Sequence, residues 1–164
     1  MTPKKSYRIW FTQRNGSTLL CKGLESTDIA GKPGEYFNVF NHASLCEEHG
    51  VKTYEELKAK LWELGTTPNG VFGIKHSWFT ERSNKLVKEI AELRGIPYKQ
   101  SINKEELFAE IFPNCKHIYL TRRNKIRQAV SWWKAIKDNV WHIEKGKVHQ
   151  NEAAFYEEQY NFDA

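Results

Sequence analysis

Two stretches of the chain combine arginine, glycine and hydroxyl side chains in a way that suits an anionic ligand. The first is Gln13-Arg14-Asn15-Gly16-Ser17-Thr18, which interrupts two apolar runs. Glycine lets the backbone approach an anion closely, hydroxyl groups donate hydrogen bonds, and arginine offers a fork that matches two oxygen atoms. If a helix begins there, its first N–H groups converge on the same point. The stretch predicts an anion site. The alternative is a helix cap beside a solvated arginine.

The second stretch runs from His117 to Ser131 and has the same ingredients. Arg122 and Arg123 follow an apolar run, and Ser131 comes two helical turns later. A solvated helix start is the alternative, but positive charge there opposes the helix dipole unless an anion is bound. Two such anion sites predict a ligand with two separate phosphate-like groups, such as a doubly phosphorylated nucleotide.

These stretches need strands and helices to position them. Apolar, β-branched and aromatic runs predict strands at 7–12, 71–75 and 117–121. Periodic apolar residues and capping signals predict helices at 17–25, 53–64, 84–93, 104–111 and 125–136. Alternating strands and helices favour an α/β fold with a largely parallel sheet. Ligands of such folds bind at the carboxyl ends of the strands, where both anion stretches begin.

The composition narrows the class of protein. The chain has 164 residues, 40% of them hydrophobic, which suits one domain with a real core. A net charge of +5 suits an anionic partner but is too modest to indicate nucleic acid. Three separated cysteines predict neither a disulfide framework nor a zinc site. The chain has no apolar run of membrane-spanning length and no signal-peptide pattern, so we expect a cytoplasmic protein.

Four segments together resemble a known family. They are TQRNGSTLL (12–20), AGKPGEYF (30–37), TTPNGVFGIKHSW (66–78) and LTRRNKIRQAVSWWKAIKDNVW (120–141). In this order they resemble the sulfotransferases that use 3′-phosphoadenosine 5′-phosphosulfate, specifically the bacterial trehalose 2-sulfotransferase-like family. The resemblance implies a P-loop-like parallel sheet flanked by helices, of the sulfotransferase type. A true P-loop kinase is disfavoured because no lysine follows Gly16.

The resemblance also implies roles for individual residues. The 5′-phosphosulfate would be held by Arg14, Asn15, Gly16, Ser17 and Thr18, and the 3′-phosphate by Ser131 with either Arg122 or Arg123. Asn15 replaces the serine usual in the family. The acceptor sugar would meet Gln13, Lys32, Pro33, Gly34, Tyr36, Phe37 and Asn38. No metal is implied, and the residues contain no cluster with metal-ligand spacing.

Glu35 matches the family's catalytic base, because a sugar hydroxyl must lose a proton to react. From the residues alone, a surface glutamate after a turn is the alternative. His76 is a rival base, although we expect a hydrogen-bonded structural histidine there. Lys75 matches a family lysine whose role stays open. The cluster Trp132, Trp133 and Trp141 is expected to form core or dimer contacts rather than to stack on adenine.

The expected function is therefore transfer of a sulfuryl group from 3′-phosphoadenosine 5′-phosphosulfate to a carbohydrate hydroxyl, with trehalose as a candidate acceptor. The alternative is a non-catalytic protein that binds the nucleotide without turnover. The resemblance further implies a homodimer. Residues 151–160 have a helical pattern close to the last residue, so we expect a single domain over 1–164 that lacks its C-terminal portion.

Overall fold

The computed structural model of the chain describes residues 2–39, 43–77, 80–99, 101–138, 140–144 and 147–150. The helix expected at 151–160 lies outside them. The chain divides into two compact units. The first contains Met1–Thr12 and Gly16–Thr121, and the second contains Gln13–Asn15 and Arg122–Ala164.

A parallel sheet forms the centre of the first unit. Its strands are β1 (Lys5–Phe11), β2 (Val71–Ser77) and β3 (Cys115–Tyr119), in the order β2-β1-β3. Both neighbours run parallel to β1, and Ile9 is in register with Lys75 on one side and Ile118 on the other. The predicted parallel sheet is confirmed, and β1 and β3, which each lead into a predicted anion stretch, are neighbours.

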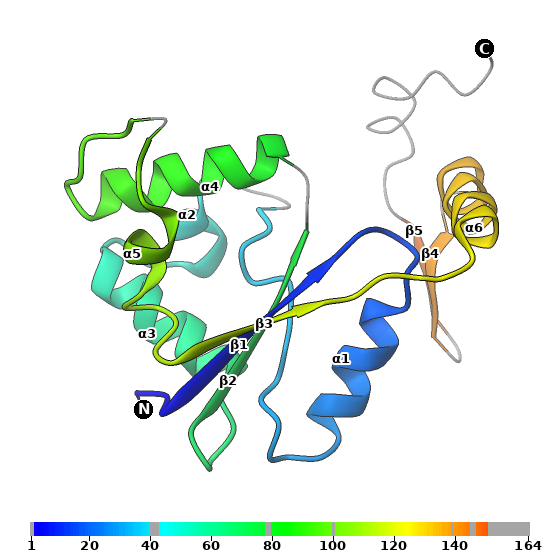
Figure 1. Ribbon diagram of the computed structural model, residues 1–164, viewed down its shortest axis with the longest axis horizontal. Coiled ribbons are helices and arrows are strands. Elements are labelled where there is room, and N and C mark those ends of the chain that lie inside the picture. The colour runs from blue at the N-terminus through cyan, green and yellow to red at the C-terminus, as the bar shows by residue number, and fades with distance from the viewer. Residues whose placement is uncertain are drawn as a thin grey trace. The chain divides into compact units, whose positions relative to one another are not determined.

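Helices cover both faces of this sheet (Figure 1). The helix α1 (Ser17–Glu25) lies on one face. The other face carries α2 (Leu45–His49), α3 (Tyr54–Gly65), α4 (Thr80–Leu93) and α5 (Lys104–Phe108). The predicted helix at 17–25 has the observed bounds of α1, whereas α4 begins before residue 84 and α5 ends before residue 111. The short α2 was not predicted.

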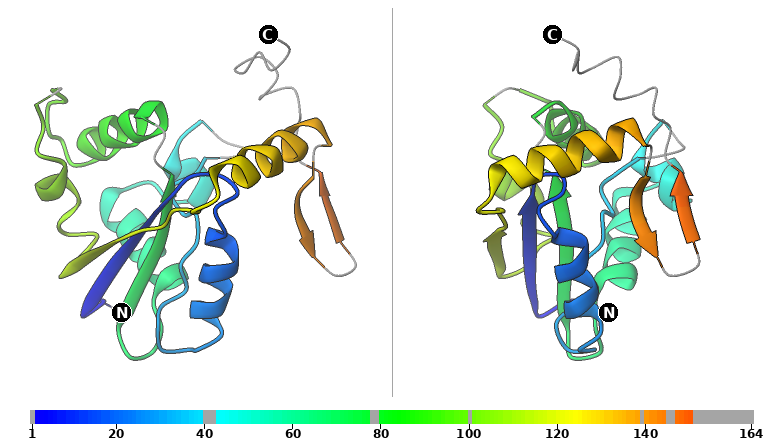
Figure 2. Two further views of the ribbon diagram at one scale, coloured as in Figure 1. Left: turned by 45° about the vertical axis from the view of Figure 1, so that its right-hand side comes forward. Right: turned by 90° about the vertical axis from the view of Figure 1, so that its right-hand side faces the viewer.

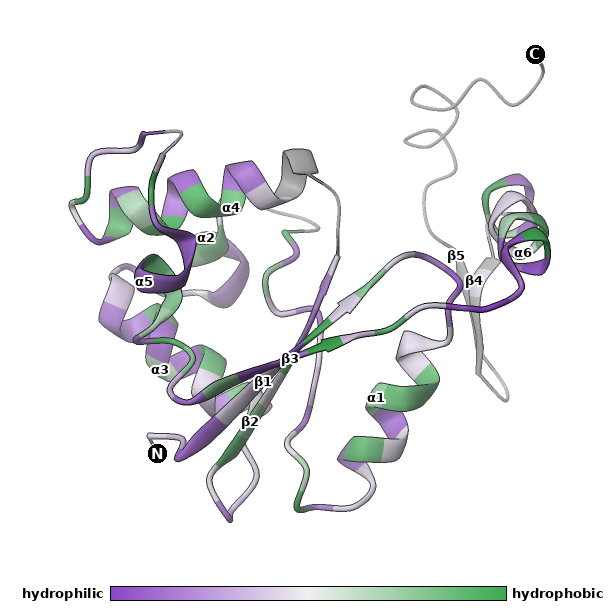
Figure 3. Cartoon of the chain, viewed as in Figure 1, coloured by the Kyte–Doolittle hydropathy of each residue, from purple (hydrophilic) through white to green (hydrophobic). Residues whose placement is uncertain are grey.

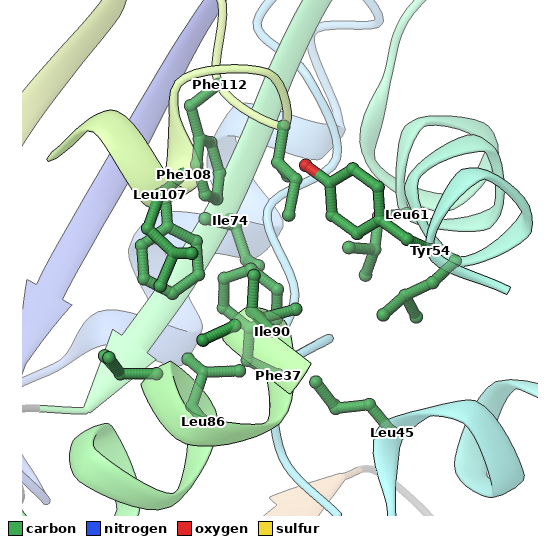
Figure 4. Close-up of a cluster of buried hydrophobic side chains, with 14 of the residues drawn as sticks. Phe37, Leu45, Tyr54, Leu61, Ile74, Leu86, Ile90, Leu107, Phe108 and Phe112 are labelled. Carbon is green, nitrogen blue, oxygen red and sulfur yellow. The ribbon is translucent and has the colours of Figure 1, made fainter. Parts of the chain in front are cut away.

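The main core fills the space between the sheet and α2 to α5 (Figure 4). Its helices mix hydrophobic and hydrophilic residues along their length, as amphipathic helices do (Figure 3). Thr53 and Glu56 form the predicted capping box at the start of α3. The core also takes in Phe37, whose ring packs against those of Phe108 and Phe112.

The segment around Glu35 follows the outer edge of β2. Lys32 N–H donates to the Gly65 carbonyl at 2.9 Å, and Lys75 N–H donates to the Gly34 carbonyl at 2.8 Å. Gly31 has a φ of +78°, and a Cβ added there would lie 2.9 Å from the backbone nitrogen of Gly73. Glycine is therefore needed for this close approach. These backbone contacts fix the residues that follow.

The second unit contains a helix and a hairpin. The helix is α6 (Lys125–Lys137), and the hairpin pairs β4 (Val140–Glu144) with β5 (Lys147–Gln150) in antiparallel fashion (Figure 2). Trp141 is buried with Ala135 and Ile136, and Trp132 packs against this small core. The expected core role thus holds for Trp141 and Trp132, whereas Trp133 remains 45% exposed.

Candidate active site

The start of α1 has the features of an anion site within the first unit. Gly16 is the N-cap residue of the helix, with a φ of +96°, and as a glycine it has no side chain that could cap the helix. No acidic residue occupies the first turn. The N–H groups of that turn and the positive end of the helix dipole therefore remain suited to a negative ligand. Ser17 is buried, and Thr18 is half-buried beside it.

Lys75 connects this helix start to the predicted base. Its Nζ lies 2.6 Å from Glu35 Oε1 and 3.3 Å from Thr18 Oγ1. The side chain of Lys75 is 8% exposed and that of Glu35 is 29% exposed. Lys75 Nζ also lies 4.8 Å from the centre of the Phe11 ring, which adds a cation–π contact. A buried ammonium is thus held by an anion, a hydroxyl and an aromatic face.

The second carboxylate oxygen of Glu35 has its own partner. Asn38 Nδ2 donates to Glu35 Oε2. The backbone of Asn38 also donates to the Glu35 carbonyl at 2.9 Å, which closes a turn around the carboxylate. Glu35 is therefore held at both oxygens and by its backbone. This is the positioning that general-base chemistry requires, because a base must lie within hydrogen-bond reach of the proton that it removes.

His76, the rival base, is engaged in a different way. Its Nδ1 lies 3.0 Å from Arg8 Nη2, and arginine can only donate, so Nδ1 is the acceptor and the proton of the neutral ring is on Nε2. Burial, together with the nearby Arg8 charge, lowers the pKa of His76 to about 3. The ring also stacks on Trp10, with centroids 4.8 Å apart. Neither nitrogen is available to accept a proton near neutral pH, so the contacts of His76 favour the structural role expected for it.

The lowered pKa of His76 makes a prediction for stability. The unfolded chain binds a proton at His76 with a pKa of 6.5, but the folded chain does so only at about 3. Unfolding therefore takes up a proton between these values, and stability falls by about 1.4 kcal/mol per pH unit as the pH drops below 6.5. Urea unfolding at pH 7, 6 and 5 measures this slope.

A His76→Gln variant provides the comparison. Its amide oxygen still accepts from Arg8 but does not titrate. We expect the variant to lose this part of the acid-dependent slope while its neighbours titrate as before. Equal slopes in the two proteins would contradict the assignment of the neutral ring.

The structure places the remaining predicted acceptor residues along the edge of β2. Lys32, Gly34 and Asn38 are half-buried, and Pro33 is buried. The Tyr36 hydroxyl donates to the Lys32 carbonyl at 2.6 Å, and burial raises the pKa of Tyr36 to about 12. Phe37 belongs to the core. Its position favours a packing role and does not support the expected contact with a sugar.

The second unit contains a separate basic cavity. Its volume is about 470 Å³, and it is lined by Arg14, Arg122, Ile126, Arg127, Val130, Ser131, Lys134, Ala135 and Asp138. Among the described residues, four cationic side chains and one acidic side chain, that of Asp138, line this cavity. Arg14 Nε donates to Ser131 Oγ at 3.1 Å, and Arg122 Nη1 donates to the Arg14 carbonyl at 3.3 Å. Residues 117 positions apart therefore meet where a phosphate would find positive charge and a hydroxyl.

Three predicted residues differ in their relation to this cavity. Arg122 lines it, whereas Arg123 is exposed and is not among the lining residues. Gln13 is fixed through its backbone carbonyl, which accepts from Gln128 Nε2 at 2.7 Å. Arg127 and Lys134 line the cavity but were not singled out from the sequence. Their spacing of four and three residues around Ser131, on one helical face, is the signal that could have found them.

Within the described residues, no group of three or more histidine, cysteine or acidic side chains is placed to hold a metal ion. None of the helices described for this chain combines the length and the apolar character needed to cross a membrane.

The sequence of the chain matches that of a known protein family. A family model described as Stf0 sulphotransferase matches residues 6–164. The chain belongs to the Stf0 sulphotransferase family. The parallel sheet flanked by helices is consistent with that membership.

Two curated proteins are similar in sequence to this chain. Trehalose 2-sulfotransferase of Mycolicibacterium smegmatis is 25% identical over 178 aligned positions, which cover 92% of this chain and 64% of the relative. Trehalose 2-sulfotransferase of Mycobacterium tuberculosis is 24% identical over 181 positions, which cover 93% of this chain and 64% of the relative. The chain thus spans 64% of the length of these Stf0 relatives.

Proposed function

We propose that this Stf0 sulphotransferase transfers a sulfuryl group from 3′-phosphoadenosine 5′-phosphosulfate to a carbohydrate hydroxyl. The observation that carries the proposal is the placement of Lys75 between Glu35 and Thr18. It joins a carboxylate suited to remove a proton to the start of a helix suited to bind an anion. The two curated relatives, both named for sulfation of trehalose, make that disaccharide the first acceptor to test.

The proposed roles follow from the two clusters. Glu35 accepts the proton of the acceptor hydroxyl as the hydroxyl oxygen attacks sulfur and the bond from sulfur to the 5′-phosphate breaks. The N–H groups at the start of α1 and the Lys75 ammonium stabilise the negative charge that develops on the departing phosphate. In the second unit, Arg122 and Ser131 bind a phosphate group of the nucleotide, and Arg14, expected from the sequence at the 5′-phosphosulfate, is assigned to the group that they bind. Positioning and charge stabilisation supply the catalysis, as in phosphoryl transfer.

The direct test is incubation with donor labelled with radioactive sulfur and a panel of sugars that includes trehalose. We expect label in a sugar product that forms only with protein. Without transfer to any sugar, the enzyme assignment would be wrong. Binding of the nucleotide without transfer would then favour the non-catalytic alternative.

Nucleotide binding is measured separately by thermal unfolding. Adenosine 3′,5′-bisphosphate at a hundred times its dissociation constant should stabilise the fold by about 2.7 kcal/mol. For a chain of this size that corresponds to a rise of roughly 5–10 °C in Tm. ATP with Mg²⁺ serves as the control and should have a smaller effect. An unchanged Tm with the bisphosphate would contradict both nucleotide-based hypotheses.

A further inference from the structure

Arg14 is held by two acceptors that belong to different elements of the second unit. Its Nε donates to Ser131 Oγ on α6 at 3.1 Å, and its Nη1 donates to the backbone carbonyl of Trp141 on β4. The Arg14 backbone has a φ of +60°, a left-handed conformation that few residues other than glycine adopt. The orientation of this guanidinium thus depends on specific contacts rather than on a regular secondary structure.

Positive charges near Arg14 repel its guanidinium, so these two hydrogen bonds are needed to hold the guanidinium in place. Burial and the positive charge of Arg122 both lower the pKa of Arg14, burial being the larger cause. Arg127 and Lys134 add further positive charge to the same cavity. The two acceptors described for the guanidinium are neutral, and Asp138 is the acidic residue described in the lining. These contacts hold a cation close to like charges, so we expect repulsion to displace it when one acceptor is lost.

The Trp141 carbonyl that accepts from Arg14 lies in an irregular part of β4. The β4–β5 ladder pairs Ile143 with Val148 and Val140 with Gln150, and its register shifts between Val140 and Ile143. Such irregularities bend a strand and re-aim its groups. Trp141 lies within the shifted stretch, and its carbonyl accepts from Arg14 Nη1.

The Trp141 side chain anchors the same stretch by its burial. It is 8% exposed and packs with Ala135 and Ile136, which are also buried, and with Trp132. Three of these residues belong to α6, the helix that carries Ser131. The two acceptors of Arg14 are thereby locked together through a small hydrophobic core.

We propose that Trp141 is a positioning residue for phosphate binding. Its buried indole anchors the irregular part of β4, whose carbonyl then holds Arg14 in the cavity beside Ser131. Trp141 does not touch the phosphate, and it acts only through Arg14. The inference rests on the proposed function insofar as the cavity receives a phosphate group of the nucleotide.

A double-mutant cycle on the full chain tests this inference. The affinity for adenosine 3′,5′-bisphosphate is measured by calorimetry for Trp141→Ala in the native background and in an Arg14→Gln background. We expect Trp141→Ala to weaken binding about tenfold when Arg14 is present and less than twofold when it is absent, because residues that act as a unit are not additive. Trp141→Phe should restore binding to within about threefold, since the ring can still fill the core.

Trp133→Ala is the matched control, because Trp133 lies on α6 but does not line the cavity. It should bind as the native chain does. If Trp141→Ala does not fold, as judged by circular dichroism, Trp141→Leu takes its place in the cycle. Equal losses in both backgrounds would overturn the inference alone. Failure of the native chain to bind the bisphosphate would overturn the proposed function together with it.

Discussion

Replacing Glu35 with glutamine is expected to lower kcat for sulfuryl transfer by about a hundredfold to ten-thousandfold, the usual contribution of a general base. The amide of glutamine retains the shape of the carboxylate, and its oxygen still accepts from Lys75. It cannot take up the acceptor's proton. Nucleotide binding should persist, because the cavity lined by Arg14, Arg122 and Ser131 is unchanged. Steady-state kinetics with labelled donor and calorimetry with the bisphosphate measure the two effects.

Glu63→Gln is the matched control for this substitution. Glu63 forms an exposed ion pair with Lys60 on α3 and lies outside the cluster around Lys75. Exposed pairs contribute little, so this variant should have native kinetics and stability. Native turnover by Glu35→Gln would show that another group removes the proton. Loss of binding together with turnover would indicate that the carboxylate organises the site rather than acting as base.

Replacing Lys75 with methionine is expected to lower kcat by about a hundredfold or more, comparable to the loss of one group that stabilises charge in a transition state. Methionine can occupy the buried volume against Phe11, but it leaves Thr18 and Glu35 without the ammonium that joins them. Removing one partner of a largely buried pair is also destabilising, because a charge remains without compensation. We expect a lower urea midpoint in addition to slower transfer.

Lys60→Met is the corresponding control, since Lys60 is the partner in the exposed pair on α3. Kinetics are compared at a temperature where both variants are folded by circular dichroism. If Lys75→Met loses stability but keeps native kcat, the lysine is a structural residue only. A Lys75→Arg variant that recovers part of kcat would support the role of positive charge at this position.

The helices and strands of the first unit could be predicted where the pattern of nearby residues agrees with how the element packs in the fold. Ser17–Glu25 and the Thr53 and Glu56 capping box follow from residues close together in the chain. The five residues of α2 make little more than one turn, so no periodicity marks them. The β4–β5 hairpin mixes polar and apolar residues, and its stabilisation comes partly from Trp141 packing on α6, which no local pattern records.

The sequence predicted the types of residue in the candidate site, but it could not predict most of the contacts between them. Arg122 and Arg123 are neighbours in the connection between β3 and α6, and only the path of the backbone selects Arg122 to line the cavity. The pair of Glu35 and Lys75 depends on a segment 40 residues earlier in the chain running along β2. Phe37 has the residue type expected of a sugar contact, but core packing uses its ring.

Residues 31–38 are attached to β2 through their backbone, so we expect the position of the Glu35 carboxylate and the choice of acceptor to depend on different groups. The segment that carries the carboxylate is attached by main-chain hydrogen bonds from Lys32 N–H to the Gly65 carbonyl and from Lys75 N–H to the Gly34 carbonyl, and by the close approach at Gly31. The Asn38 side chain does hold the carboxylate, through Glu35 Oε2, but the half-buried side chain of Lys32 is not part of these contacts. Under the proposed function, we therefore expect exchange of the Lys32 side chain to alter which hydroxyl compound is accepted, while Glu35 stays in the same place. Within this lineage, diversification of acceptors and preservation of chemistry need not compete.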